Sequence, residues 1–238
     1  MSEKPFQFKQ FSIFQEKAAM KVGTDGVLLG AWVQLKNNPF SILDIGAGTG
    51  LIALMMAQRS DAEVIDAIEL NDDAYEQTVE NFENSDWGDR LFCYHAYFQE
   101  FVAEINDEYD VIISNPPFYN STYKELSEDR AMARHTESLP YAELLEGVSK
   151  LVSEKGICAF IIPFSEEENF VSLANANGLY LNRVTRVKGT SDSPIKRSLL
   201  QFSFVKNNVE ITELTIEIER HQYTEDYKAL TKDFYLKM

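Results

Sequence analysis

SILDIGAGTGLIALMMAQR, residues 41–59, is the stretch that decides the fold. It begins with an apolar run short enough for a buried strand and ends with a run that has the composition of a helix. Gly46, Gly48 and Gly50 lie where the strand turns into the helix. Open, doubly wound sheets bind ligands outside the carboxyl ends of their strands, most often at the first such turn. The stretch therefore predicts an α/β fold with a ligand site at this turn.

The alternation of strand-like and helix-like segments continues beyond the turn. The further expected strands are 63–70, 90–95, 110–114, 156–163, 179–187 and 198–206, and the helices between them are 72–83, 98–105, 140–152 and 165–178. Helices between strands imply right-handed crossovers and a parallel sheet. The last two strands have no helix between them, which favours an antiparallel hairpin. We predict a mostly parallel, seven-stranded sheet with an antiparallel edge strand and helices on both faces.

The two ends of the chain add elements to this core. TDGVLLGAWVQL (24–35) predicts a helix with Thr24 or Asp25 as its N-cap, LTIEIER (214–220) an extra strand, and residues 224–236 a terminal helix. Because no linker-like stretch interrupts the chain, we expect one domain over residues 1–238. We expect 1–40 to cover cofactor and substrate, 41–206 to form the core, and 207–238 to add the C-terminal strand and helix.

The composition excludes several classes of protein. No apolar stretch reaches the roughly 18 residues that span a membrane, and the N-terminus MSEKPFQFKQF has no signal-peptide core. Cys93 and Cys158 have neither CxxC nor Cys/His spacing, which argues against a zinc site or a disulfide. We therefore expect a cytoplasmic protein with no membrane association, no metal and no obligate protein partner.

The net charge of −16 is unevenly distributed. Residues 61–89 contain eleven acids and no Lys or Arg, whereas residues 183–206 contain six basic residues and one acid, Asp192. Sequence-independent binding of nucleic acid needs phosphate neutralisation, so the total alone argues against it. The distribution allows one face to repel a polyanion while another binds it. A merely solvated mixture of charges is the alternative.

The residues around the glycines indicate which ligand the turn binds. Their spacing is G-x-G-x-G, with Leu51 where a dinucleotide fingerprint needs glycine, and no P-loop lysine follows. Asp44 adds a carboxylate, which suits an ammonium group better than a phosphate. Glu69 ends the second strand, where an acid can accept hydrogen bonds from both ribose hydroxyls. A ligand with a ribose, a positive charge and no phosphate fits S-adenosylmethionine.

NPPF (115–118) follows the fourth strand, which neighbours the first in such sheets. Pro116 and Pro117 restrict the backbone and make a rigid corner. An exocyclic amino group is a poor nucleophile because its lone pair is delocalised into the ring. The Asn115 side-chain oxygen and the Pro116 carbonyl could accept its two hydrogens, and Phe118 could stack on the ring. A simple strand stop or an apolar loop over the core are the alternatives.

LDIGAGTG, Glu69 and NPPF together resemble the class I methyltransferases that act on planar amino groups. Closer similarity extends over nearly the whole chain. KVGTDGVLLGAW (21–32), RAMARHTESLPYAELL (130–145), SPIKRSLLQFSF (193–204) and the terminal DFYLK are similar to the bacterial family that methylates the 6-amino group of the adenosine after the anticodon of a valine tRNA. The resemblance implies a Rossmann-like class I methyltransferase fold, S-adenosylmethionine as cofactor and tRNA as substrate.

The resemblance also implies roles for individual residues. Cofactor contacts are implied at Asp44, Gly46, Gly48, Gly50 and Glu69, amino-group recognition at Asn115 and Pro116, and base stacking at Phe118. There is one departure, because such enzymes commonly carry an Asp after the third strand to meet the adenine of the cofactor, and this chain has Ala96. Tyr97 or Phe98 can cover the adenine instead, or a neighbouring acid can serve.

Two groups of basic residues are candidates for substrate binding. Arg130, Arg134 and His135 follow the corner on what looks like a long loop, which favours an RNA-contacting lid over surface salt bridges. Lys188, Lys196 and Arg197 flank GTSDSP and are the best phosphate-binding candidates. We expect substrate contacts at Pro117, Arg134, Lys196 and Arg197. Thr24 and Asp25 either close over the bound molecules or serve only as a cap.

Three rival functions remain compatible with these motifs. The first two keep the fold and change the target, to the guanine 2-amino group in ribosomal RNA or to a glutamine amide in a release factor. The amide-modifying enzymes normally carry a separate helical N-terminal domain, for which the residues before the first core strand leave little room. The third is a cofactor-binding scaffold without activity, which the intact NPPF argues against.

Overall fold

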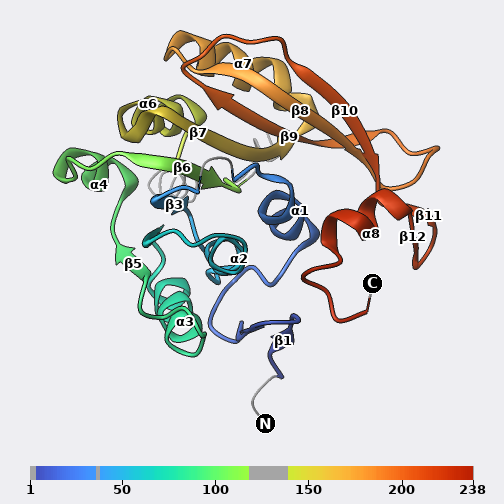
Figure 1. The fold of residues 1–238 in the computed structure, drawn as a ribbon, viewed down its shortest axis with the longest axis horizontal. Coiled ribbons are helices and arrows are strands. Elements are labelled where there is room, and N and C mark those ends of the chain that lie inside the picture. The colour runs from blue at the N-terminus through green and yellow to red at the C-terminus, as the bar shows by residue number, and fades with distance from the viewer. Residues whose placement is uncertain (1–3, 36–37, 118–138, 238) are drawn as a thin grey trace, which may run out of the picture.

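An eight-stranded sheet forms the centre of the molecule in the computed structural model, which describes residues 4–35, 38–117 and 139–237 (Figure 1). Its strand order is β10-β8-β9-β7-β6-β3-β4-β5. The strands are β3 (Ser41–Ile45), β4 (Val64–Glu69), β5 (Leu91–His95), β6 (Tyr109–Ser114), β7 (Val152–Pro163), β8 (Tyr180–Lys188), β9 (Ile195–Ser203) and β10 (Glu210–Thr215). The strand that precedes NPPF, β6, lies beside β3 as expected.

The sheet is mostly parallel, as predicted, but it has eight strands and not seven. β9 pairs antiparallel with both β7 and β8, which gives the expected hairpin, and β10 then pairs parallel with β8. The eighth strand begins before the predicted segment 214–220 and overlaps it only at Leu214 and Thr215, because its pairing runs from Glu210 opposite Arg183 to Thr215 opposite Lys188. Residues after it form a separate small hairpin of β11 (Glu217–Glu219) and β12 (Gln222–Tyr223).

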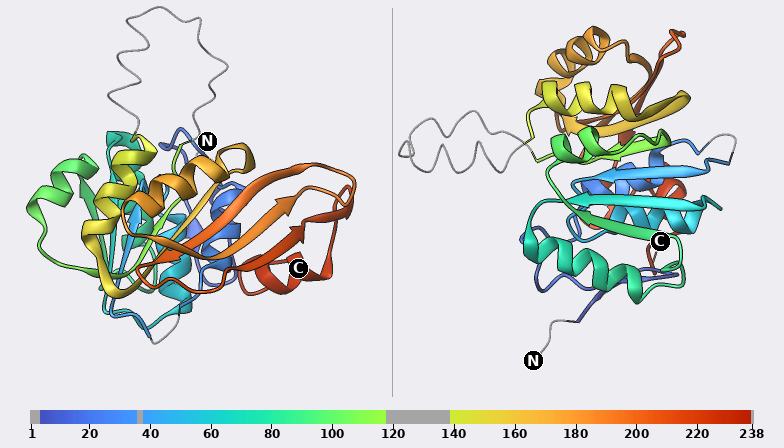
Figure 2. Two further views of the ribbon diagram at one scale, coloured as in Figure 1. Left: turned by 90° about the horizontal axis from the view of Figure 1, so that it is seen from above. Right: turned by 90° about the vertical axis from the view of Figure 1, so that its left-hand side faces the viewer.

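Helices cover both faces of the sheet (Figures 1 and 2). One face carries α1 (Thr24–Trp32), α2 (Leu51–Arg59), α3 (Asp72–Glu83) and α8 (Glu225–Thr231). The other carries α4 (Phe98–Glu104), α6 (Tyr141–Leu151) and α7 (Glu167–Ala176), the last preceded by the 3-10 turn η1 (Phe164–Glu166). No helix in the described ranges is long and apolar enough to cross a membrane.

The central strands are mostly apolar because both of their faces are buried, with Asp44 in β3 and Asp66 in β4 as buried exceptions. In β3, Ile42 packs into the core beneath α1 and α2, whereas Leu43 and Ile45 pack into the core beneath α4 and α6. Ile112 and Ile113 of β6 divide between the two cores in the same way. β3 and β6 are thus packed on both faces. Because they pair in parallel, the glycine turn and the NPPF corner lie at the same end of these two strands.

Helix α1 begins differently from the prediction. Its N-cap is Gly23, without a side-chain cap, and Thr24 is the first helical residue, so neither Thr24 nor Asp25 is the cap. Asp25 instead lies in the first turn, where its Oδ2 accepts a hydrogen bond from Arg197 Nε at 2.8 Å. The carboxylate is therefore used across the fold, between α1 and β9.

The two ends of the chain pack together. The short strands β1 (Phe6–Gln7) and β2 (Ser12–Ile13) form a hairpin, and Phe8 between them bridges to Tyr235. Lys9 N donates to Phe234 O at 2.8 Å. Phe234 is buried, so this part of the C-terminal segment belongs to the core. The predicted terminal helix is present but shorter, because α8 ends at Thr231.

Candidate functional site

Parallel pairing brings the ends of β3, β4 and β6 to one edge of the sheet (Figure 2). Ile45 is level with Ile68 on one side and with Ser114 on the other. Asp44, Glu69 and Asn115 therefore gather at the carboxyl ends of three adjacent strands. This is the position that ligands occupy in open α/β sheets.

The glycine turn holds its shape through backbone bonds and positive φ angles. Gly46 N and Ala47 N donate to Ile68 O at 2.9 and 3.1 Å, and Gly46, Gly48 and Gly50 have φ of 74°, 62° and 74°. These angles favour glycine at all three positions. The three differ in surroundings, since a Cβ at Gly46 or Gly48 would meet no atom within 4 Å, whereas one at Gly50 would lie 2.6 Å from Phe82. The first two glycines thus border open space, and the third allows close packing on α3.

Glu69 fixes the turn from the neighbouring strand. Its Oε2 accepts from Gly48 N at 2.8 Å, and its Oε1 accepts from Leu70 N and Asn71 N, each at 2.9 Å. A carboxylate has about four lone-pair sites, so it can still accept hydrogen bonds from a ligand hydroxyl. Glu69 can therefore both hold the turn and bind a ribose.

Asp44 is fully buried, and only one of its two carboxylate oxygens has a hydrogen-bond partner. Its Oδ2 accepts from Ala53 N at 3.1 Å, but its Oδ1 has no hydrogen-bond partner. Burial raises the pKa of Asp44 to about 7, the Ala53 hydrogen bond opposes this, and the charge of Glu69 raises it further. A buried oxygen without a donor is costly, so this carboxylate is suited to a cationic ligand.

The NPPF corner carries a second unpaired acceptor at the same edge of the sheet. Ser114 Oγ donates to Ile45 O at 2.7 Å, which ties the end of β6 to β3. Asn115 is half-buried and its Oδ1 has no partner, while Pro116 is buried and Pro117 exposed. Of the four buried side-chain oxygens without a partner in the described ranges, Asn115 Oδ1 and Asp44 Oδ1 are the two at this edge. Phe118, Arg130, Arg134 and His135 lie outside the described residues.

The end of β5 carries Ala96 and Tyr97, for which the sequence left the contact with the adenine of the cofactor open. Ala96 N donates to Glu69 O at 3.3 Å, and Tyr97, the N-cap of α4, is 42% exposed. The Nε2 atom of His95 lies 2.9 Å from Leu70 O and 3.0 Å from Asp72 Oδ1, and its ring is stacked on Tyr75. It therefore steadies the turn that carries Glu69. Tyr97 remains a prediction as an adenine contact.

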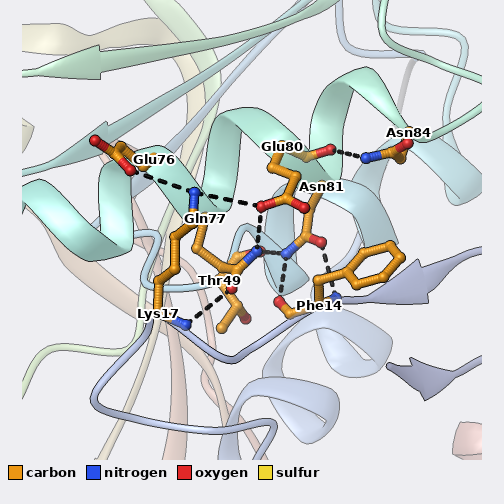
Figure 3. A network of polar contacts seen from close by, with 8 residues as sticks. All are labelled: Phe14, Lys17, Thr49, Glu76, Gln77, Glu80, Asn81 and Asn84. Carbon is orange, nitrogen blue, oxygen red and sulfur yellow. Dashed lines mark hydrogen bonds and ion pairs between the residues drawn. The ribbon is translucent and has the colours of Figure 1, made fainter. Parts of the chain in front are cut away.

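Helix α3 supports the glycine turn from behind, which sequence analysis missed (Figure 3). Thr78 Oγ1 donates to Gly48 O at 3.0 Å, and Asn81 Nδ2 donates to Thr49 O at 2.9 Å. Asn81 also exchanges two hydrogen bonds of 2.8 Å with the backbone of Phe14. Polar residues in an amphipathic helix read as solvent-facing, yet both side chains are buried. Their spacing of three residues, which puts them on one face, was the available signal.

The basic segment 183–206 is largely paired with acids. The ion pairs are Arg183–Glu210 at 3.6 Å, Arg186–Glu167 at 2.7 Å, Lys188–Glu213 at 2.8 Å and Arg197–Asp25 at 2.8 Å. Lys196 is exposed. Because β9 runs antiparallel to β7, its first residues lie at the carboxyl end of β7, with Arg197 opposite Pro163. Lys196 and Arg197 are thus on the same edge of the sheet as Asn115.

The described residues contain no group of three or more His, Cys, Asp or Glu side chains that could hold a metal ion. Cys158 is buried and Cys93 half-buried, and both are free thiols. Burial raises the pKa of Cys93 to about 12, and it also raises that of Cys158. Neither thiol is ionised near neutral pH, so neither can act as a nucleophile.

The edge as a whole fits one kind of small ligand. Open space borders Gly46 and Gly48, Glu69 can accept from hydroxyls, and Asp44 Oδ1 is an unpaired buried acceptor. Asn115 Oδ1 adds a neutral acceptor at the neighbouring strand end. These features suit a cationic nucleoside next to a second molecule that offers an amino group.

Known proteins of similar sequence and fold carry methyltransferase names. Residues 22–139 match the family described as methyltransferase small domain. Among solved structures, a predicted O-methyltransferase from Agrobacterium tumefaciens superposes with a TM-score of 0.68 at 17% identity, covering 88% of this chain and 96% of that one. A methyltransferase from Pyrococcus furiosus superposes with a TM-score of 0.57 at 18% identity, covering 81% and 89%. At these identities the likeness shows the fold, that of a class I methyltransferase.

Two curated relatives extend the likeness to the whole chain. The tRNA1(Val) (adenine(37)-N6)-methyltransferase of Christiangramia forsetii is 62% identical over 240 residues, which is 100% of each chain. The protein of the same name from Bacteroides fragilis is 44% identical over 239 residues, again 100% of each. Since the identity extends beyond the shared fold into every segment, the chain belongs to the family of tRNA1(Val) (adenine(37)-N6)-methyltransferases.

Proposed function

We propose that the protein methylates the 6-amino group of adenosine 37 in tRNA1(Val), with S-adenosylmethionine as the methyl donor. The observation that carries the proposal is the unpaired, buried Asn115 Oδ1 beside the glycine turn of a chain that belongs to this family. Because tRNA is the substrate, the protein acts in the cytoplasm.

The residues at the ends of β3 and β4 would hold the cofactor. Gly46 and Gly48 let it approach the backbone, Glu69 accepts hydrogen bonds from the ribose, and Asp44 Oδ1 meets positive charge. Gly50 contributes through packing, and the exposed ring of Tyr97 would cover the adenine. When bound, S-adenosylmethionine supplies a methyl group on a positively charged sulfur. The protein's task is to orient the amino group towards it and to exclude water.

Asn115 and Pro116 would orient the amino group. The Asn115 side-chain oxygen and the Pro116 carbonyl accept its two hydrogens, which withdraws the nitrogen lone pair from the ring and stabilises the positive charge that develops there. Ser114 fixes this corner through its hydrogen bond to Ile45 O, so little conformational freedom is lost on binding. Phe118 would stack on the adenine, which has to leave the base stack to enter the site.

Pro117, Lys196 and Arg197 lie around the same edge, whereas Arg134 lies outside the described residues. Pro117 is exposed beside Asn115, and Lys196 is exposed at the start of β9. We assign phosphate contacts to Lys196, Arg197 and Arg134. Arg197 has to exchange or share its partner Asp25 when it binds a phosphate.

The test uses labelled S-adenosylmethionine and two transcripts of tRNA1(Val), one unmodified and one with guanosine at position 37. We expect N6-methyladenosine from the first transcript and no incorporation into the second. A parallel incubation with total cellular RNA and protein separates the rivals. Methylguanosine in ribosomal RNA, or label in protein, would replace the proposed target. Absence of transfer to every acceptor, with cofactor bound, would favour a scaffold.

A further inference from the structure

Asn81 connects two segments of the chain that are far apart in sequence. Its Nδ2 donates to Thr49 O in the glycine turn at 2.9 Å and to Phe14 O at 2.8 Å, and its Oδ1 accepts from Phe14 N at 2.8 Å. Figure 3 shows the side chain lying between Phe14 and Thr49. Asn81 is 1% exposed, so water does not compete for these bonds. One buried amide thus holds the cofactor turn and the N-terminal segment together.

The hydrogen bonds of Asn81 are fully used in this arrangement. The amide has two hydrogens, and each has a carbonyl acceptor. If residues 14–17 moved away, the Asn81 side-chain oxygen and one of its N–H groups would lose their partners in this arrangement. The same amide plane would then be free to turn away from Thr49 O. Both segments must be in place for either to be held well.

Two neighbouring residues of α3 each make one of these two connections. Thr78 Oγ1 donates to Gly48 O at 3.0 Å and so contacts the glycine turn alone. Gln77 Oε1 accepts from Lys17 N at 3.1 Å and so contacts the N-terminal segment alone. Both side chains are as deeply buried as Asn81. The chain therefore offers matched controls for each half of the Asn81 connection.

We propose that Asn81 is a positioning residue that couples cofactor binding at the glycine turn to the order of residues 14–17. The proposal rests on S-adenosylmethionine binding at the turn. A coupling of this kind is reciprocal, so a segment that is held in place strengthens cofactor binding by the factor by which the cofactor stabilises the segment. Gln15 Oε1 accepts from Val22 N at 2.9 Å, which carries the order of the segment on towards α1.

Hydrogen exchange measures the coupling directly. Backbone amides of residues 12–22 are followed with and without saturating S-adenosylhomocysteine, in the wild type and in Asn81→Ala, Thr78→Val and Gln77→Leu. We expect the ligand to slow exchange at Phe14 in the wild type, and this protection to disappear in Asn81→Ala. Thr78→Val should retain the protection of Phe14 once the variant is saturated with S-adenosylhomocysteine. Gln77→Leu should also retain the protection of Phe14, while the amide of Lys17 exchanges faster.

Steady-state kinetics with tRNA provides a second readout. Asn81→Ala should raise the KM for S-adenosylmethionine by about tenfold, the loss of roughly one buried hydrogen bond, with kcat nearly unchanged. Gln77→Leu loosens the segment only at Lys17 and should raise this KM less than Asn81→Ala does. If Asn81→Ala does not fold, Asn81→Asp keeps the size of the side chain and the acceptor for Phe14 N while removing both donors, and the same losses are expected.

The outcomes separate the coupling from the proposed function. Cofactor-dependent protection at Phe14 that is as strong in Asn81→Ala as in the wild type overturns the coupling, as does its absence in a wild type that binds the ligand by calorimetry. A wild type that binds no S-adenosylhomocysteine overturns cofactor use itself. A wild type that shows protection but methylates no tRNA keeps the coupling and overturns the target.

Discussion

At the carboxyl ends of β3, β4 and β6, side chains hydrogen-bond to backbone groups, whereas across β8, β9 and β10 they pair with one another. In the first region, Glu69, Thr78 and Asn81 bind the backbone of the glycine turn. In the second, the guanidinium and ammonium groups are bound by carboxylates: Arg183–Glu210, Arg186–Glu167, Lys188–Glu213 and Arg197–Asp25. The first region also leaves two buried oxygens unpaired, on Asp44 and Asn115.

The difference matters for what each region can bind. Buried hydrogen bonds to the backbone fix a geometry that salt does not screen, which suits a small ligand bound in one position. Half-exposed ion pairs contribute little stability and are screened by salt, so a cation can exchange a carboxylate for a phosphate at small cost. We expect the first region to set the chemistry and the second to set affinity for RNA.

The largest effect is expected at Asn115. Asn115→Ala should lower turnover by about 100-fold or more, because the acceptor acts where charge develops in the reaction. Cofactor affinity should change little, since the cofactor contacts that we propose are at the ends of β3 and β4. Single-turnover methylation and calorimetry measure the two quantities. Asn115→Asp, which keeps an acceptor oxygen, is the matched control for loss of size. Unchanged turnover in Asn115→Ala would contradict the view that the first region sets the chemistry.

An intermediate effect follows from the raised pKa of Asp44. In the folded protein this carboxyl group titrates near pH 7, whereas in the unfolded chain it titrates near 3.8. Its contribution to stability is therefore fully present below about pH 4 and is lost as the pH rises towards 7, because the unfolded chain releases the proton first. A cationic ligand favours the ionised form, so cofactor affinity should rise about tenfold from pH 6 to pH 8.

Calorimetry in buffers of different ionisation enthalpy checks the Asp44 prediction. At pH 6 the heat of binding should depend on the buffer, because one proton is released on binding. Asp44→Asn should bind the cofactor more weakly and lose both the pH dependence and the buffer dependence. Equal affinity at pH 6 and pH 8 in the wild type would mean that Asp44 stays in one protonation state.

The smallest effect is expected in the paired region. Lys196→Gln should weaken tRNA binding a few-fold and reduce the slope of log K against log salt by about 1. Arg197→Gln should reduce the slope less, because Arg197 already binds Asp25 and phosphate only replaces one partner by another. Lys150→Gln, at the end of α6 and the opposite edge of the sheet, is the control and should leave the slope unchanged. Equal slopes for all three variants would place the RNA elsewhere.

The sequence predicted the parts of the fold that depend on buried, apolar pattern. β3, β4, β6 and β7 are mostly apolar because helices cover both of their faces, and the glycine turn follows the first of them. β10 was misplaced and left out of the sheet count because Glu210 to Glu213 are exposed, so its sequence has no apolar run. What holds it is backbone pairing with β8, which composition does not reveal.

The sequence allowed the positions of the candidate site residues to be predicted, whereas their roles stay predictions. Asp44 lies near the end of a predicted strand, Glu69 ends one and Asn115 follows one, and parallel pairing brings them together. Contacts that depend on tertiary packing were not predictable. Nothing in the sequence near Asn81 points to Phe14 or Thr49, and nothing near Arg197 points to Asp25, because these partners are 32 to 172 residues away.

The contact between the two ends of the chain has a consequence for synthesis on the ribosome. Phe8 and Lys9 are made more than 200 residues before their partners, Tyr235 and Phe234. The central strands can pair during translation before Phe234 and Tyr235 emerge, whereas the N-terminal hairpin gains these contacts only afterwards. A chain terminated before Phe234 would leave the aromatic rings of Phe6 and Phe8 without their partner Tyr235. The late synthesis of Phe234 and Tyr235 thus affects the segment that leads, through Phe14 and Asn81, to the glycine turn.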